Sequence, residues 1–136
     1  MSGKVFVDTN IFVYLFDGRN PEKQRIARGL LTQATSDSRI VLSTQVLQET
    51  YVALTRKLNI APETALEAVT TMTTYTVVQT DPHLVVKGIR RSMDSRLSLW
   101  DALIVEAALE ARCEVLYSED LSDGQRFDSV TVRNPF

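Results

Sequence analysis

The chain has 136 residues, 44% of them hydrophobic, which is enough for one domain with a single hydrophobic core. Its 17 acidic and 15 basic residues leave a formal charge of −2, which argues against the strongly basic surface of a typical groove-reading DNA-binding module. One cysteine, Cys113, and one histidine, His83, exclude intramolecular disulfides, Cys/His zinc sites, Cys–His dyads and Ser–His–Asp triads. Among the common kinds of catalytic and metal-binding site, those built from Asp and Glu carboxylates remain.

The sequence predicts neither a signal peptide nor a membrane span. The apolar start Val5–Val7 is interrupted by Asp8, Thr9 and Asn10 before the apolar run 11–16 begins. A lone cysteine without disulfides is typical of a reducing compartment. We therefore expect residues 1–136 to form one cytoplasmic domain that does not associate with a membrane.

Short apolar, β-branched runs alternate with longer segments of helical period, a pattern typical of an α/β domain with a mainly parallel sheet. The predicted strands are Lys4–Asp8, Ile40–Ser43, Thr76–Gln79, Glu114–Tyr117 and a short closing Val130–Val132. Five helices are predicted between the strands. One begins at Asn20-Pro21, and a helical hairpin follows, with one helix from Ser43 or Thr44 to about Lys57 and the other from Pro62 to about Tyr75. The last two run from Pro82 to Met93 and from Ser98 to about Arg112. The stripe Val85, Ile89 and Met93 is expected to be the buried face of the helix that begins at Pro82.

Four carboxylates lie in apolar surroundings. Asp8 ends the first strand and Asp120 follows the strand Glu114–Tyr117, so both lie at one sheet edge if those strands are parallel neighbours. Glu49 and Asp101 share helix faces with apolar residues and point toward the core side.

Each acid also has a purely structural explanation. Asp8 can cap a short helix, Asp101 can belong to a capping box with Ser98, Glu49 can pair with an arginine, and Asp120 can serve a turn. Four carboxylates converging on one cleft would repel each other unless a cation held them, which favours a joint role. With no Cys or His ligands, an all-oxygen site suits Mg²⁺ or Mn²⁺, and such a site without a phosphate-binding glycine loop suits phosphodiester hydrolysis.

These motifs resemble the acidic signature of PIN-domain ribonucleases: Val7-Asp8-Thr9-Asn10, Glu49, Trp100-Asp101-Ala102 and Ser118-Glu119-Asp120, in that order along the chain. The segment from Ser118 to Phe136 is similar to a bacterial subgroup that includes VapC toxins. The resemblance implies a three-layer α/β/α sandwich and Mg²⁺- or Mn²⁺-dependent endonucleolytic cleavage of RNA. It also implies a homodimer and an antitoxin protein as partner in a type II toxin–antitoxin pair.

Carried over by position, the resemblance makes Asp8 and Asp101 the principal metal ligands, with Glu49 and Asp120 completing the acidic cluster directly or through water. Thr9, Asn10 and Ser118 would orient them. Glu119 and Asp123 compete with Asp120 for the fourth acidic position, and the sequence leaves this choice open.

Candidate RNA contacts lie on the helix that begins at Pro82. Lys87, Arg90 and Arg91 share one face and Arg96 follows, which predicts a track for phosphates, although a solvated face with an Arg90–Asp94 pair is an equal alternative. Trp100 and Tyr14 are candidates to stack on RNA bases, but both lie among apolar neighbours, which favours packing in the core.

Two other functions remain open. One is a catalytically silent PIN-like module that binds RNA or a protein. The other is a Mg²⁺-dependent phosphatase with Asp8 as nucleophile, which Asn10 disfavours because it replaces the second acid of the usual Asp-x-Asp pair.

Overall fold

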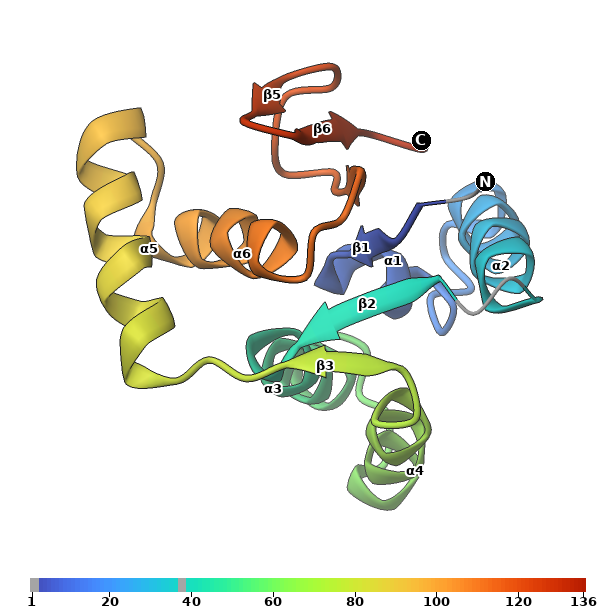
Figure 1. The fold of residues 1–136 in the computed structure, drawn as a ribbon. Helices are drawn as coiled ribbons and strands as arrows, with labels where there is room; N and C mark the ends of the chain where they lie inside the picture. The colour runs from blue at the N-terminus through green and yellow to red at the C-terminus, as the bar shows by residue number, and fades with distance from the viewer. Residues whose placement is uncertain (1–2, 37–38) are drawn as a thin grey trace.

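The computed structural model describes residues 3–36 and 39–136 and is built around a six-stranded sheet in the order β3-β2-β1-β4-β6-β5 (Figure 1). Neighbouring strands run parallel, except that β5 pairs antiparallel with β6. The strands are β1 (Val5–Val7), β2 (Ile40–Ser43), β3 (Thr76–Val78), β4 (Val115–Tyr117), β5 (Arg126–Phe127) and β6 (Val130–Arg133).

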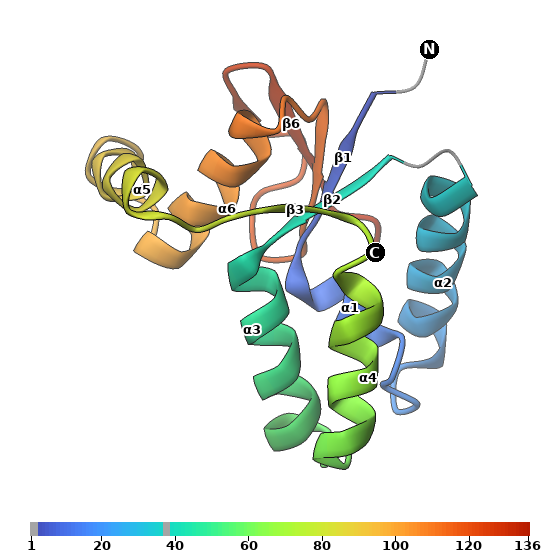
Figure 2. The same cartoon turned by 60° about the horizontal axis from the view of Figure 1, so that its bottom comes forward.

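Helices cover both faces of the sheet. Helices α1 to α4 gather on one side and the α5–α6 pair lies on the other, which gives three layers (Figure 2). The helices are α1 (Thr9–Tyr14), α2 (Pro21–Ser36), α3 (Thr44–Val52) with its π-helical continuation η1 (Ala53–Lys57), α4 (Pro62–Met72), α5 (Pro82–Ser95) and α6 (Leu99–Glu110). The expected three-layer α/β/α architecture with a mainly parallel sheet is confirmed.

Local sequence signals set where the helices begin. Ser43 caps α3 by accepting a hydrogen bond from the Val46 amide, and Asp81 caps α5 by accepting one from the Leu84 amide at 2.9 Å. Proline occupies the first turn of α2, α4 and α5, where its missing N–H costs nothing. Among the helices of the described ranges, none is long and apolar enough to cross a membrane.

The buried face of α5 differs from the predicted stripe. Leu84 and Gly88 are buried against α6, whereas Ile89 is 43% and Met93 75% exposed. Gly88 allows this close packing, because a Cβ atom at that position would lie 2.6 Å from a methyl carbon of Leu103. The buried face therefore runs through Leu84 and Gly88, and of the predicted stripe only Val85 is partly buried, because a closely packed glycine carries no hydrophobic signal in the sequence.

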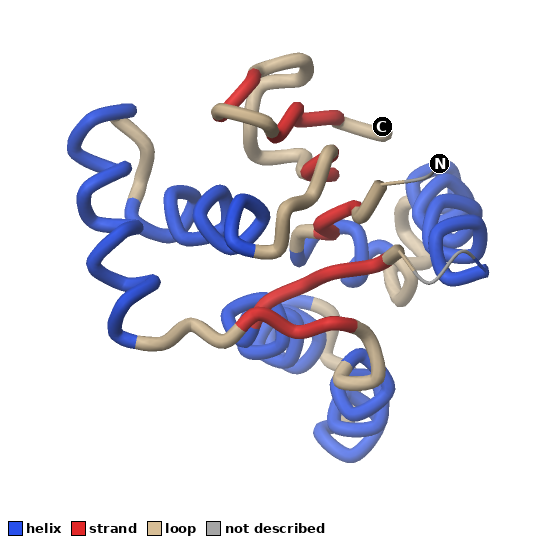
Figure 3. The backbone as a smooth tube through the Cα atoms, in the orientation of Figure 1, coloured by secondary structure: helices blue, strands red, loops and turns tan. Residues whose placement is uncertain are grey.

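The order of the strands reverses at the centre of the sheet. From β1 the chain moves outward to β2 and β3, whereas β4, β6 and β5 lie on the other side of β1. In open α/β sheets, such a reversal leaves a crevice at the carboxyl ends of the two central strands, and ligands bind there. A short helix, α1, follows β1, whereas β4 is followed by a loop that leads to β5 (Figure 3). The residues that follow these two strands are therefore candidates for a ligand site.

Candidate active site

Asp8 and the segment Ser118–Asp120 meet at this crevice. Strands β1 and β4 pair in parallel, with Val7 opposite Tyr117, and the Asp8 amide donates a hydrogen bond to the Tyr117 carbonyl at 3.0 Å. The parallel pairing on which the sequence argument depended is thus present.

Asp8 is a buried carboxylate, only 4% exposed. Its Oδ1 accepts a hydrogen bond from the Thr9 amide at 2.7 Å, so it also caps α1, and its Oδ2 accepts one from the Ser118 hydroxyl at 2.8 Å. Burial raises the pKa of Asp8 to about 7, with smaller contributions from the charges of Asp120 and Glu49, while the two hydrogen bonds oppose the shift. A cation at this position would favour the ionised form.

Glu49 reaches the same place from α3. Its Oε1 accepts a hydrogen bond from the Thr9 hydroxyl at 2.9 Å, and its Oε2 accepts one from the Gln45 side-chain amide at 3.2 Å. Gln45 is buried and its amide also donates to the Trp100 carbonyl at 3.1 Å, at the start of α6. A single buried side chain therefore ties Glu49 to the helix that carries the next acid.

Asp101 lies in the first turn of α6. Its backbone amide donates to the Ser98 hydroxyl at 3.1 Å, which is the serine half of the capping box expected from the sequence. Burial raises the pKa of the Asp101 carboxyl, and the negative charges of Asp120 and Glu49 raise it further. Asp101 therefore takes part in the cap of α6 and also lies within reach of the charges of Asp120 and Glu49.

Only one of the three acids in the segment 119–123 faces the cluster. Asp120 accepts a hydrogen bond from the Asn10 side chain at 3.1 Å, and its charge acts on both Asp8 and Asp101. Glu119 turns away to Tyr14 and Lys23, and Asp123 accepts a hydrogen bond from the Asn134 amide at 2.9 Å.

The four acids fit a divalent metal by donor chemistry, although they are not already closed around an ion. Within the described ranges, no three Asp, Glu, His or Cys side chains stand in an arrangement that would hold a metal. Mg²⁺ commonly keeps several waters and takes only one or two carboxylates directly from the protein, so an open, all-oxygen cluster suits it. Asp8 carries unfavourable burial and repulsion that such an ion would offset.

The profile of the family described as the PIN domain matches residues 5–128. The chain belongs to the PIN domain family. No match is found among curated proteins.

Solved structures similar to this PIN domain include three from bacteria. A toxin–antitoxin complex from Klebsiella pneumoniae has a TM-score of 0.71 and 21% identity, with 98% of each chain covered. Mycobacterium tuberculosis VapC20, described as a toxin that cleaves the sarcin–ricin loop, has a TM-score of 0.65 and 23% identity, covering 86% of this chain and 90% of that one. DNA-bound VapBC from Salmonella typhimurium has a TM-score of 0.69 and 20% identity, covering 99% and 100%. At these identities the likeness establishes the fold.

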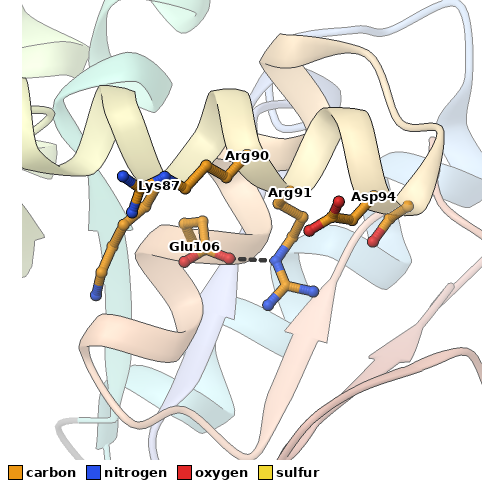
Figure 4. A pocket seen from close by; sticks show the side chains of 6 residues that line it. Lys87, Arg90, Arg91, Asp94 and Glu106 are labelled. Carbon is orange, nitrogen blue, oxygen red and sulfur yellow. Dashed lines mark hydrogen bonds and ion pairs between the residues drawn. The ribbon is translucent and has the colours of Figure 1, made fainter.

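The expected phosphate track on α5 is only partly available in this PIN domain. Figure 4 shows Arg91 directed at Glu106 across the α5–α6 hairpin, and Arg91 also contacts Asp128 at 3.1 Å. Lys87 and Arg90 are exposed and form no ion pair with another residue of the described ranges, so the alternative Arg90–Asp94 pair is absent there. Arg96 is exposed as well and ends α5 in a left-handed conformation.

The two aromatic residues expected to pack in the core differ in outcome, since Tyr14 packs against the core from its edge and Trp100 does not. Trp100, next to Asp101 in the PIN domain, is 62% exposed, because the first turn of α6 projects beyond the core. Tyr14 is only partly buried and donates its hydroxyl to Glu119 at 2.6 Å. Sequence reasoning also missed Gln45, although its position four residues before Glu49 on one helix face was a usable signal.

Proposed function

We propose that this PIN domain is a Mg²⁺- or Mn²⁺-dependent endoribonuclease that hydrolyses RNA phosphodiester bonds. The observation that carries the proposal is the approach of four carboxylates from four separate segments, Asp8, Glu49, Asp101 and Asp120, to one edge of the sheet. Burial and neighbouring negative charges raise the pKa of Asp8 and of Asp101, and carboxyls perturbed in this way are commonly functional. Family membership adds independent support for a nuclease.

The proposed roles follow from the contacts. Asp8, Asp101 and Asp120 are the metal ligands, and Glu49 completes the acidic set. Ser118 orients two of these groups, because its hydroxyl donates to Asp8 and accepts from the Asp120 amide at 3.2 Å.

Two further side chains orient the acids. The Thr9 hydroxyl holds Glu49, and the Asn10 amide holds Asp120. A bound divalent ion would offset the phosphate charge and activate a water for in-line attack.

RNA binding is assigned to three exposed cations: Lys87 and Arg90 within α5, and Arg96 just after its end. Arg91 is the weakest of the four predicted contacts, since Glu106 and Asp128 already occupy its guanidinium. Replacing Lys87 and Arg90 with Met should weaken RNA binding and reduce the slope of log K against log salt by about 1 to 2, because each phosphate that the protein no longer neutralises accounts for about one unit.

The partner we propose is an antitoxin protein, and the assembly a cytoplasmic homodimer. Support for the antitoxin comes from the similar structures, two of which are toxin–antitoxin assemblies of other proteins. A neighbouring gene for a small protein with a DNA-binding end and a disordered tail would add to it.

The decisive experiment incubates structured and unstructured RNAs with the purified protein and Mg²⁺ or Mn²⁺. Wild type should produce fragments, Asp8→Asn should not, and Asp123→Asn should behave as wild type, because Asp123 lies on the same segment but faces the Asn134 amide. Cleavage that is the same in the wild type and in Asp8→Asn would refute the proposal. RNA affinity that persists in EDTA, without products under any metal, would instead establish a silent binding module.

A further inference from the structure

Glu119 lies between Ser118 and Asp120, yet its side chain leaves the acid cluster. Tyr14 donates its hydroxyl to Oε1 of Glu119 at 2.6 Å, and the Lys23 ammonium donates to Oε2 at 2.5 Å. The Lys23 ammonium also donates to the Tyr14 hydroxyl at 3.2 Å, which closes a triangle of contacts. We call Tyr14, Lys23 and Glu119 the Lys23 cluster.

The Lys23 cluster is partly shielded from solvent. The side chains of Lys23 and Glu119 are 38% and 24% exposed. The Lys23 ammonium lies 5.0 Å from the centre of the Tyr14 ring and 5.6 Å from that of Phe136, and the two rings meet edge to face at 4.9 Å. Aromatic walls and a second hydrogen bond make this pair more rigid and less screened than an ordinary surface salt bridge.

Through Glu119, the Lys23 cluster fixes the segment that carries Asp120. On one side of this segment Ser118 donates to Asp8 and Asp120 accepts from Asn10. On the other side Glu119 is fixed to Tyr14, at the end of α1, and to Lys23, on α2. The segment is therefore held from both sides.

The Lys23 cluster also sets the local charge. It pairs Glu119 with a cation and holds its carboxylate at Tyr14, outside the group formed by Asp8, Glu49, Asp101 and Asp120. Without that cation, a fifth negative charge would stand one residue from Asp120, with the Tyr14 hydroxyl and the charge of Lys57 as its remaining partners.

We infer that Lys23 is a positioning residue for the acid cluster: with Tyr14 it holds Glu119, and thereby presents Asp120 toward Asp8 and Asp101. The inference rests on the proposed function, because the purpose of this positioning is metal binding by those acids. Residues that orient metal ligands from outside commonly contribute 10–100-fold to affinity or activity. Lys23 acts through one further residue, so we expect about tenfold.

The test compares Lys23→Met with Arg25→Met in the full chain. Arg25 is the matched control, since it is a cation on the same helix that pairs with the solvent-exposed Glu22 and not with Glu119. Three measurements apply: hydrogen exchange of a peptide covering residues 118–121 without metal, the Mn²⁺ dissociation constant by calorimetry, and kcat and KM on RNA.

For Lys23→Met we expect exchange in that peptide to be at least about fivefold faster, Mn²⁺ binding about tenfold weaker and kcat about tenfold lower, with KM within about twofold of wild type. Arg25→Met should match wild type in all three, and Lys23→Arg should recover most of the Mn²⁺ affinity. Glu119→Gln should reproduce Lys23→Met, and the double variant should be no worse than either single one, since both remove the same interaction.

Unchanged Mn²⁺ affinity in both Lys23→Met and Glu119→Gln would overturn the positioning role, whatever the exchange rates. In that case the proposed metal site would still stand, provided that wild type binds Mn²⁺ and Asp8→Asn does not. Wild type that binds no Mn²⁺ would contradict the metal site itself and remove the positioning role with it.

Discussion

Replacing Asp8 with Asn should stabilise the metal-free protein at neutral and alkaline pH. The pKa of Asp8 rises from 3.8 to about 7 on folding, mainly through burial. A difference of about 3 pKa units corresponds to about 4 kcal/mol of destabilisation by the ionised group. Asn keeps the shape of Asp8 and its oxygen can still cap α1, but the contact with Ser118 must rearrange, which costs about 1 kcal/mol. The expected gain at pH 8 is therefore about 3 kcal/mol.

The sign of this effect should change with pH. An acid whose pKa is raised by folding binds protons more tightly in the native state, so stability is lost as pH rises from 3.8 to 7. Above pH 7 the whole cost of ionised Asp8 applies, and the Asn variant gains most. Near pH 4 Asp8 is protonated in the native state, so the gain vanishes and the variant should be about 1 kcal/mol less stable.

Thermal unfolding in EDTA at pH 4, 6 and 8 measures this directly. For a domain of this size about 3 kcal/mol corresponds to roughly 10 °C in Tm. Saturating Mn²⁺ should raise the Tm of wild type at pH 8 and leave Asp8→Asn unchanged, because only the native carboxylate site gains from the ion. An Asn variant that is less stable than wild type at pH 8 in EDTA would refute the reasoning.

Three other predictions concern neighbouring features. Gln45→Met should weaken Mn²⁺ binding at least about tenfold by calorimetry, since it removes the buried link between Glu49 and α6, whereas Gln48→Met, at an exposed position of the same helix, should have no effect. Gly88→Ala should destabilise the protein by about 1 kcal/mol, because the added methyl group overpacks against α6. Gly29→Ala on α2 meets no atom within 4 Å and should stabilise the protein by up to about 1 kcal/mol. Equal changes in the free energy of unfolding, measured in urea, would contradict the packing argument. The only tryptophan, Trp100, is exposed beside the acid cluster, so its fluorescence should change when Asp8→Asn protein binds RNA; an unchanged spectrum at saturation would place the RNA elsewhere.

Most of the fold follows from local signals in the sequence. The run Ile40–Ser43 coincides with β2, and Pro21, Pro62 and Pro82 mark the starts of three helices. The strand β5 was missed, because its two residues form a strand only by pairing with β6. Close packing at Gly88 likewise depends on a partner helix that the sequence pattern does not specify.

The candidate site was predictable as a set of acids but not as an arrangement. Asp8 and Glu49 stand out because carboxylates are rare among apolar neighbours. The choice among Glu119, Asp120 and Asp123 could not be made, because it depends on the contact between Glu119 and Lys23, residues 96 positions apart. A long-range ion pair of this kind leaves no periodic trace in the sequence.

The pairing of β1 with β4 also determines when the site can exist. The hydrogen bond from Ser118 to Asp8 joins residues separated by 110 positions, so the acids assemble only after a very long loop has closed. During synthesis, a nascent chain that has passed β3 but not yet reached α6 holds Asp8 and Glu49 without Asp101 or Asp120, and one that has not yet reached β4 still lacks Asp120. The proposed nuclease site therefore cannot assemble next to the ribosome before residues 118 and 120 have been synthesised.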